Sequence, residues 1–250
     1  MKKTTTKKQK LWITLAAFVG VIAILFASFG IYVNDYYRAK TSDIKEYVES
    51  HKDIEEKELA DGSLVYKNTK KESSKGLIFY PGGKVEHTAY TPLMVACAEK
   101  GFTCILIKMP FNLAVLDKNA AKGVQEDYPE IQDWYIGGHS LGASMAASYV
   151  AKNAEDFKGL FLLAGYSTVD LSDSGLKVLS IYGSEDKIMN RKNYEKYKPN
   201  LPADYSRHED VEGWCHSYFG MYGLQKGDGE TSKTPKSQIE STAAKISVWS

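Results

Sequence analysis

A serine stands in the middle of a short glycine-rich sequence, GHSLG, at 138–142. This G-x-S-x-G pattern follows an apolar run at 134–137, predicted as a strand, and precedes a small-residue segment at 141–152, predicted as a helix. A sharp strand-to-helix turn of this kind exposes a serine hydroxyl as a nucleophile and needs small residues on both sides. The two glycines meet that need. The sequence therefore predicts that Ser140 attacks a carbonyl carbon.

A serine hydroxyl needs a general base, and the base needs an acid that orients it. In a strand–turn–helix context the chain order is serine, acid, histidine. Two histidines follow Ser140 in the sequence. His208 lies within a predicted strand at 205–211, whereas His216 lies in the loop after that strand. We therefore expect His216 to be the base.

The acid is expected directly after the preceding strand, which is predicted at 178–182. The sequence YGSEDK at 182–187 places two carboxylates there. Asp186 is the predicted acid, and Glu185 is the alternative.

Two backbone N–H groups are needed to stabilise the negative charge on the carbonyl oxygen. Leu141 directly follows the nucleophile, and Gly83 lies in the loop after the first parallel strand, so their amides are predicted to form this oxyanion hole. Four further residues are predicted to line a substrate pocket: Lys84, His139, Phe111 and Trp214.

Charge and cysteine usage exclude several classes of protein. The 250 residues carry a formal net charge of +1, but five lysines and no acid lie in residues 1–33, so the rest of the chain has a net charge of −4. A nucleic-acid-binding surface is normally basic. The three cysteines form no C-x-x-C pattern, and the sequence has no H-x-H or H-E-x-x-H. We expect no nucleic-acid partner, no metal and no cofactor.

The N-terminus has the pattern of a membrane segment. Residues 11–33 form an uncharged apolar run of 23 residues. A helix of that length measures roughly 34 Å, enough to cross a hydrocarbon core of about 30 Å. The lysines before it predict a cytoplasmic tail at 1–10 and an extracytoplasmic location for the rest. We expect a single-pass anchor in the bilayer of the cell membrane, with a cleaved signal peptide and secretion as the alternative.

Apolar runs and helical segments alternate through the rest of the chain. Residues 34–53 are predicted as a helical stalk or linker and 54–250 as one catalytic domain. Continuous apolar runs separated by helices indicate an α/β fold, with a mostly parallel sheet covered on both faces. The predicted strands are 55–59, 64–67, 76–80, 102–108, 134–137, 161–164, 178–182 and 205–211. The predicted helices are 91–100, 112–127, 141–152 and 235–248.

Five blocks of the sequence carry a resemblance to a known family. They are YPGGKVEHTAY (80–90), KMPFNLAVLD (108–117), GGHSLGAS (137–144), YGSEDK (182–187) and GWCHSYFGMYG (213–223). In this order they resemble the α/β-hydrolase fold-5 family, relatives of dienelactone hydrolase, over roughly residues 76–228, and the chain looks like a membrane-anchored bacterial member. The resemblance implies an α/β-hydrolase fold with Ser140, Asp186 and His216 at the positions of a Ser–Asp–His triad.

The resemblance also bears on how open the site is. Large cap domains in α/β-hydrolases usually lie between the sixth strand and the acid strand, where this chain has only residues 165–177. We therefore expect no large cap domain and a site covered at most by loops.

These features together predict a serine hydrolase, most simply a carboxylesterase acting on small acyl esters or lactones. Its expected partner is a small-molecule acyl substrate. An acyltransferase or a peptidase would use the same triad, and a non-catalytic binding module on the same fold is a further alternative.

Overall fold

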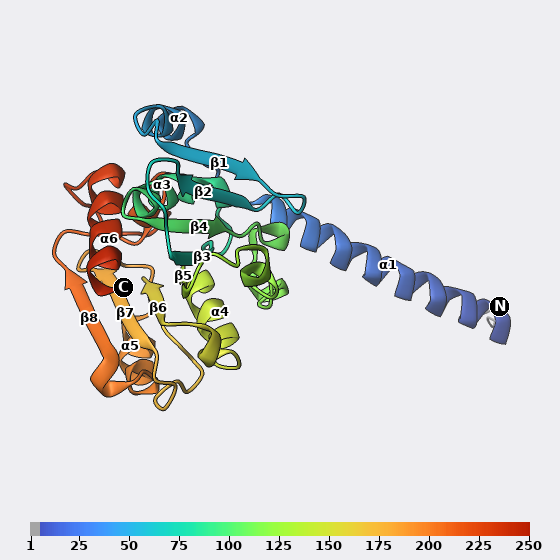
Figure 1. The fold of residues 1–250 in the computed structure, drawn as a ribbon. Coiled ribbons are helices and arrows are strands. Elements are labelled where there is room, and N and C mark those ends of the chain that lie inside the picture. Colours follow the sequence, from blue (N-terminus) through green and yellow to red (C-terminus); the bar gives the residue numbers. More distant parts are fainter. Residues whose placement is uncertain (1–5) are drawn as a thin grey trace. The chain divides into compact units, whose positions relative to one another are not determined.

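The computed structural model describes residues 6–250 and divides the chain into two units, Met1–Tyr36 and Tyr37–Ser250. The first unit contains helix α1, Lys7–Asn34, drawn in blue in Figure 1. None of the residues of α1 is buried. The helix is long and apolar enough to cross a membrane, a property that membrane anchors and signal sequences share. It contains the whole of the predicted membrane segment at 11–33.

The second unit is built on an eight-stranded sheet with the order β1-β2-β4-β3-β5-β6-β7-β8. The pairs β1–β2 and β2–β4 are antiparallel, and all the other neighbouring pairs are parallel. Each predicted strand is present, with ends shifted by no more than two residues. The strands are β1 (Ile54–Glu58), β2 (Leu64–Asn68), β3 (Lys75–Tyr80), β4 (Phe102–Leu106), β5 (Asp133–His139), β6 (Gly159–Leu163), β7 (Lys177–Gly183) and β8 (Ser206–Val211).

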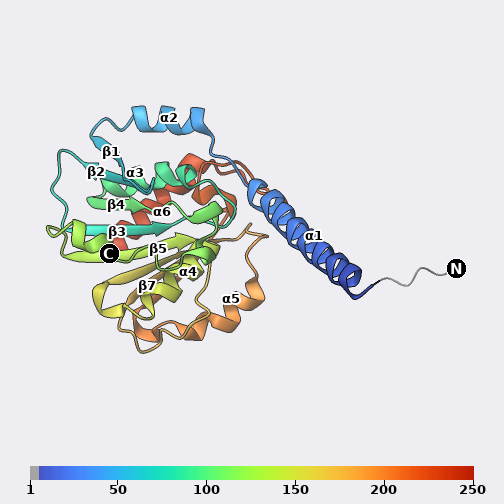
Figure 2. The ribbon, with the colours of Figure 1, turned by 90° about the vertical axis from the view of Figure 1, so that its right-hand side faces the viewer.

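Helices cover both faces of this sheet, as the sequence predicts. Leu77 and Phe79 of β3 belong to the core cluster shared with α3 and α6, whereas Ile78 and Tyr80 belong to the cluster shared with α4. Alternate residues of one buried strand thus serve two cores, which is why its sequence is continuously apolar. Figure 2 shows α2 beside β1 at one end of the sheet and α5 near β7 at the other. The helices are α2 (Thr41–Glu49), α3 (Thr91–Glu99), α4 (Leu141–Val150), α5 (Arg191–Tyr197) and α6 (Pro235–Trp249).

The helix predicted at 112–127 is wrong, because the structure has only short 3₁₀ turns there. The buried hydroxyl of Tyr80 donates to the Lys118 carbonyl at 2.9 Å and accepts from the Ala121 amide at 2.8 Å. These contacts use backbone groups that an α-helix would pair internally. The 3₁₀ turns between β4 and β5 are η2 (Pro110–Asn112), η3 (Ala114–Leu116) and η4 (Val124–Asp127).

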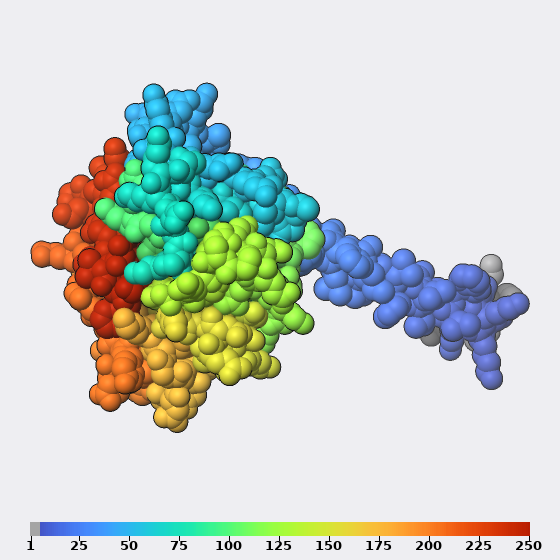
Figure 3. All heavy atoms as spheres, viewed as in Figure 1, coloured from blue at the N-terminus to red at the C-terminus, as the bar shows by residue number. Residues whose placement is uncertain are grey.

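Residues 34–53, predicted as a stalk, are mostly part of the second unit, which begins at Tyr37. Helix α2 buries Ile44 and Tyr47 in the core cluster that contains α3 and α6. Figure 3 shows the blue spheres of this segment lying against the body of the second unit. The i, i+3 spacing of the two buried residues gives the helix one apolar side, and burying that side holds it on the domain.

The parallel strands end at one edge of the sheet, and the loops after four of them carry the predicted site residues. Gly83 follows β3, Ser140 follows β5, Asp186 follows β7 and His216 follows β8. In α/β folds this carboxyl edge is where ligands bind.

Candidate active site

Ser140 occupies a sharp turn between β5 and α4. Its φ of 53° and ψ of −118° are unfavourable for a residue with a side chain, and its amide donates to the Leu163 carbonyl at 2.8 Å. A Cβ on Gly138 would lie 2.6 Å from the carbonyl carbon of Gly142, and a Cβ on Gly142 would lie 2.2 Å from the carbonyl oxygen of Tyr80. Only glycine fits either position, so the turn depends on both glycines of GHSLG.

Asp186 and His216 are hydrogen-bonded to each other and buried. Oδ2 of Asp186 lies 2.8 Å from Nδ1 of His216. The other carboxylate oxygen, Oδ1, accepts from the amides of Ile188 at 2.9 Å and Met189 at 2.8 Å. Because a carboxylate only accepts hydrogen bonds, the shared proton lies on Nδ1 of the histidine. Nε2 is then the ring nitrogen that is able to take a proton.

The alternative acid and base make other contacts. The carboxylate of Glu185 accepts a hydrogen bond of 3.1 Å from the hydroxyl of the preceding serine. Nδ1 of His208 lies 2.7 Å from the hydroxyl of Tyr194. Of the carboxylates and histidines weighed from the sequence, the structure thus brings together Asp186 and His216.

The side chains of Ser140 and His216 share no hydrogen bond within the described residues. The ring of His139 packs against the ring of His216 with their centroids 4.5 Å apart and their planes at 52°. The imidazole of His216 therefore lies against the residue that directly precedes the serine. Serine–histidine contacts of this type are often loose without substrate and close when it binds.

Two backbone N–H groups beside the turn donate to no acceptor within residues 6–250. Leu141 is the first residue of α4, where no intrahelical acceptor exists. Gly83 has a free amide, whereas the amides of its two chain neighbours are used in other hydrogen bonds. The loop and the turn touch, because a Cβ on Gly83 would lie 2.8 Å from Cδ2 of Leu141. An oxyanion hole needs two such amides on adjacent segments, so the prediction for Leu141 and Gly83 is compatible with this geometry.

His139, predicted to line a pocket, is buried and connects two segments of the site. Its Nδ1 lies 2.7 Å from the hydroxyl of Tyr90, and that hydroxyl accepts from the Gly82 amide at 3.1 Å. Burial, and then the nearby His216, hold the pKa of His139 well below its ordinary value, so the ring is neutral. His139 and Tyr90 thus link β5 to the loop that carries Gly83. The sequence analysis assigned no role to Tyr90, although Tyr90 is the last residue of the block YPGGKVEHTAY (80–90).

The other three predicted pocket residues lie in different environments. Trp214 is buried in the core with its ring edge-on to Phe219, the two ring centroids lying 5.9 Å apart, and its place in a pocket wall stays a prediction. Its loop contacts the loop that follows β7, since the Trp214 carbonyl accepts from the Glu185 amide at 2.9 Å. Lys84 is half-buried with a φ of 58°, and Phe111 is 57% exposed with a φ of 52°.

Asp228 fixes the loop that carries His216. Its Oδ1 accepts from the His216 amide at 3.3 Å, and its Oδ2 accepts from the amide and the hydroxyl of Ser217 at 2.8 and 2.6 Å. Burial raises the pKa of Asp228, but the hydrogen bonds from Ser217, Gly229 and His216 outweigh it and hold this pKa below its ordinary value. Sequence reasoning missed Asp228, because a lone loop carboxylate gives no pattern.

A side chain of α6 also holds the loop that carries His216. The buried side chain of Gln238 donates to the Cys215 carbonyl at 2.9 Å and accepts from the Cys215 amide at 3.2 Å. A glutamine paired in this way satisfies both backbone groups of a buried loop residue. The sequence offered no signal for it.

The described part of the chain was also searched for side chains that could bind a metal ion. There, no three or more His, Cys, Asp or Glu side chains group together in a way that holds a metal ion.

The model of the alpha/beta hydrolase family matches residues 76–240 of the sequence. The chain belongs to this family. The match covers the loops of Gly83, Ser140, Asp186 and His216, so all the predicted catalytic positions lie in the part that the alpha/beta hydrolases share. Among curated proteins, none matches this alpha/beta hydrolase in sequence.

Solved structures share its fold at low sequence identity. A protein described as a predicted CIB-like hydrolase from Thermoplasma acidophilum is 16% identical with a TM-score of 0.54, covering 78% of this chain and 98% of its own. TT1662 from Thermus thermophilus is 17% identical with a TM-score of 0.57, and the match covers 78% of this chain and 98% of TT1662. Carboxyl esterase 2 from the mycorrhizal fungus Tuber melanosporum is 12% identical with a TM-score of 0.55, and the match covers 79% of this chain and 86% of the esterase. The family and these folds support a hydrolase.

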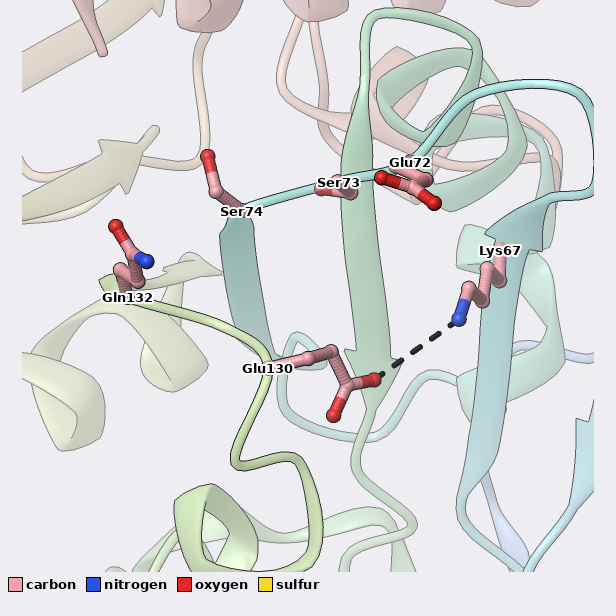
Figure 4. A pocket seen from close by; sticks show the side chains of 6 residues that line it. All are labelled: Lys67, Glu72, Ser73, Ser74, Glu130 and Gln132. Carbon is pink, nitrogen blue, oxygen red and sulfur yellow. Dashed lines mark ion pairs between the residues drawn. The ribbon is translucent and has the colours of Figure 1, made fainter.

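A separate surface hollow of about 570 Å³ lies near the opposite edge of the sheet. Figure 4 shows its six polar lining residues, among them Ser73 and Ser74 just before β3 and Gln132 just before β5. An ion pair of 3.9 Å between Lys67 and Glu130 crosses it. It contains none of the predicted catalytic residues and is not part of this site.

Proposed function

We propose that this alpha/beta hydrolase is a serine carboxylesterase for small acyl esters or lactones. Ser140 is the nucleophile, His216 the general base and Asp186 the acid that orients it. The observation that carries the proposal is the 2.8 Å contact between Asp186 and His216 beside a serine held at a φ of 53°. Strained backbone of this kind persists where the surrounding structure enforces it, commonly at active sites.

The geometry supports an acyl-enzyme mechanism. Oγ of Ser140 attacks the ester carbonyl carbon while Nε2 of His216 takes the hydroxyl proton, and Asp186 stabilises the imidazolium that forms. The amides of Leu141 and Gly83 stabilise the oxyanion of the tetrahedral intermediate. Collapse breaks the ester bond, and His216 returns the proton to the departing alcohol. A water molecule then hydrolyses the acyl-serine bond by the same steps.

A fluorophosphonate probe tests the nucleophile. The full chain should be labelled, and Ser140→Ala should lose both the label and ester turnover. Ser144→Ala is the matched control, because Ser144 lies on α4 one turn further on and its hydroxyl donates to the Tyr166 carbonyl at 2.8 Å. Labelling that survives in Ser140→Ala, or that is lost in Ser144→Ala, would contradict the assignment.

The same proposal includes a single-pass membrane location with the catalytic domain outside. This location is supported by the apolar helix α1 and by the charge of residues 1–10, which contain five lysines and no acidic residue. Protease added to intact cells should remove the catalytic domain. Complete protection until lysis would show the reverse orientation, and a soluble form lacking α1 would show that the segment is a cleaved signal.

A further inference from the structure

The segment that follows α1 is part of the rim of the candidate active site. Tyr37 is the third residue after the end of α1 at Asn34. Its amide donates to the Lys84 carbonyl at 2.8 Å, and its carbonyl accepts from the Glu86 amide at 2.9 Å. Lys84 and Glu86 belong to the loop of Gly83, one of the two predicted oxyanion donors. The chain therefore enters the second unit at the oxyanion loop.

The same segment also touches the loop that follows His216. The hydroxyl of Tyr37 accepts from the Lys226 amide at 3.0 Å. Three residues further on, the amide of Lys40 donates to the Met221 carbonyl at 2.8 Å. The entry segment is therefore hydrogen-bonded to both the loop of Gly83 and the loop that follows His216, and we call the place where these three segments meet the mouth of the site.

An apolar loop adjoins this entry point. The amide of Lys84 donates to the carbonyl of Asn112 at 2.8 Å, which places residues 109–117 next to the segment bonded to Tyr37. This loop exposes three large apolar side chains, Phe111 at 57%, Val115 at 56% and Leu116 at 50%. It is held down by three buried neighbours: Met109, Leu113 and Ala114.

Exposed apolar side chains on a firmly held loop are typical of a surface that meets a partner or a membrane. Only Asp35 and Tyr36 separate the end of α1 from Tyr37. Three residue steps of extended chain reach about 11 Å at most. If α1 spans the bilayer, the mouth of the site is tied to the membrane surface by this short connection.

We propose that the side chains of Phe111, Val115 and Leu116 enter the bilayer that holds α1, and that the site takes its ester from that bilayer. The substrate class is an amphiphile with a short acyl group, whose alcohol part stays in the lipid while the ester carbonyl reaches Ser140. This rests on the proposed function for the chemistry and on α1 remaining as an anchor. With this loop inserted, the membrane covers the apolar side of the mouth, as a cap domain would.

Lipid contact is measurable without any turnover. Val115→Cys in the full chain, reconstituted in vesicles of phosphatidylcholine and phosphatidylglycerol, is labelled with an environment-sensitive fluorophore. The native thiols of Cys97, Cys104 and Cys215 are all buried, and burial raises the pKa of Cys215 to about 12, so the added thiol is the reactive one. Nitroxide groups on the lipid acyl chains should quench the label at position 115.

Val248→Cys is the matched control for this measurement. Val248 is 80% exposed on α6, whose last residues lie near the start of β3, where Lys75 Nζ donates to the Ser250 hydroxyl at 2.9 Å. The label there should remain in water and be quenched several-fold less. Equal quenching at positions 115 and 248 would overturn the proposal.

Delivery of substrate from the membrane has its own test. The double variant Val115→Asp/Leu116→Asp should hydrolyse hexadecyl acetate embedded in the vesicles at least about tenfold more slowly, because charged side chains oppose insertion. Its turnover of water-soluble p-nitrophenyl acetate should match that of the unaltered chain. Equal rates of both chains on hexadecyl acetate, or an equal loss on both esters, would overturn the proposal. Ser140→Ala keeps the two ideas apart, since full activity in that variant would refute the esterase chemistry and leave the quenching result valid.

Discussion

Nδ1 of His216 lies 2.8 Å from Oδ2 of Asp186, although the two residues are 30 positions apart in the chain. They meet because β7 and β8 are parallel neighbours whose ends face each other, with Gly183 opposite Val211. The loops that leave these two strands at the same edge carry Asp186 and His216, the proposed acid and base. The pairing of the last two strands therefore assembles this half of the site.

Replacing the acid should lower activity without removing the fold. In Asp186→Asn an amide takes the place of the carboxylate, so the imidazole loses its orienting charge and the stabilisation of its protonated form. We expect kcat to fall on the order of 10⁴-fold, as in other Ser–His–Asp triads. Steady-state kinetics on a short p-nitrophenyl ester measures this loss, and Glu185→Gln is the matched control. If Glu185→Gln lost its activity and Asp186→Asn kept it, Glu185 would be the acid instead of Asp186.

The Tyr90 hydroxyl should act as a positioning group for the oxyanion loop. Tyr90→Phe removes the acceptor of the Gly82 amide and the partner of His139 Nδ1. We expect kcat to fall by roughly tenfold or more with KM little changed, since the oxyanion donors act on the transition state, where each is worth about 10²–10³.

Tyr222→Phe is the control for that variant. Tyr222 packs against Tyr90 with ring centroids 6.3 Å apart, and no hydrogen bond of ordinary geometry reaches its buried hydroxyl within residues 6–250. Its loss should leave kcat unchanged. If both variants lowered kcat equally, packing rather than the hydroxyl of Tyr90 would be responsible.

Asp228 should make stability depend on pH in the acid range. Its folded-state pKa lies below the unfolded value of about 3.9, so the ionised carboxylate stabilises the fold above that pH. This contribution is lost as the pH falls from about 4 through the lower folded-state pKa. Urea unfolding at a series of pH values should show a smaller acid-induced loss in Asp228→Asn than in the unaltered chain. Asp173→Asn, at an exposed carboxylate, should retain the full pH dependence.

Without a cap domain, the site should favour esters with short acyl chains. Residues 164–176, between β6 and β7, form no helix or strand within the described chain. Each further methylene that is buried would add about 0.8 kcal/mol, close to fourfold in kcat/KM. Without a cap, carbons beyond the first few gain no such burial. We expect kcat/KM for soluble p-nitrophenyl esters to peak at roughly two to six acyl carbons. A steady rise with longer acyl chains, below their aggregation limit, would contradict an open site.

The sequence by itself determined the features that depend on neighbouring residues. Continuous apolar runs located the buried inner strands such as β3 and β6, because burial on both faces leaves a local signature. The GHSLG motif located the turn at Ser140, because its φ of 53° and the close approach of Tyr80 to Gly142 allow few other residues there. The length and lack of charge at 11–33 likewise specified α1.

The tertiary structure alone decided what depends on distant partners. The segment at 112–127 has helical spacing, yet the Tyr80 hydroxyl takes hydrogen bonds that a helix needs. Trp214 belongs to the core cluster, which its loop sequence does not indicate. Tyr90, Asp228 and Gln238 support the site through contacts with residues 8 to 49 positions away, and such contacts leave no periodic pattern in a sequence. Side-chain hydrogen bonds between loops exist only after the strands have paired and brought those loops to one edge.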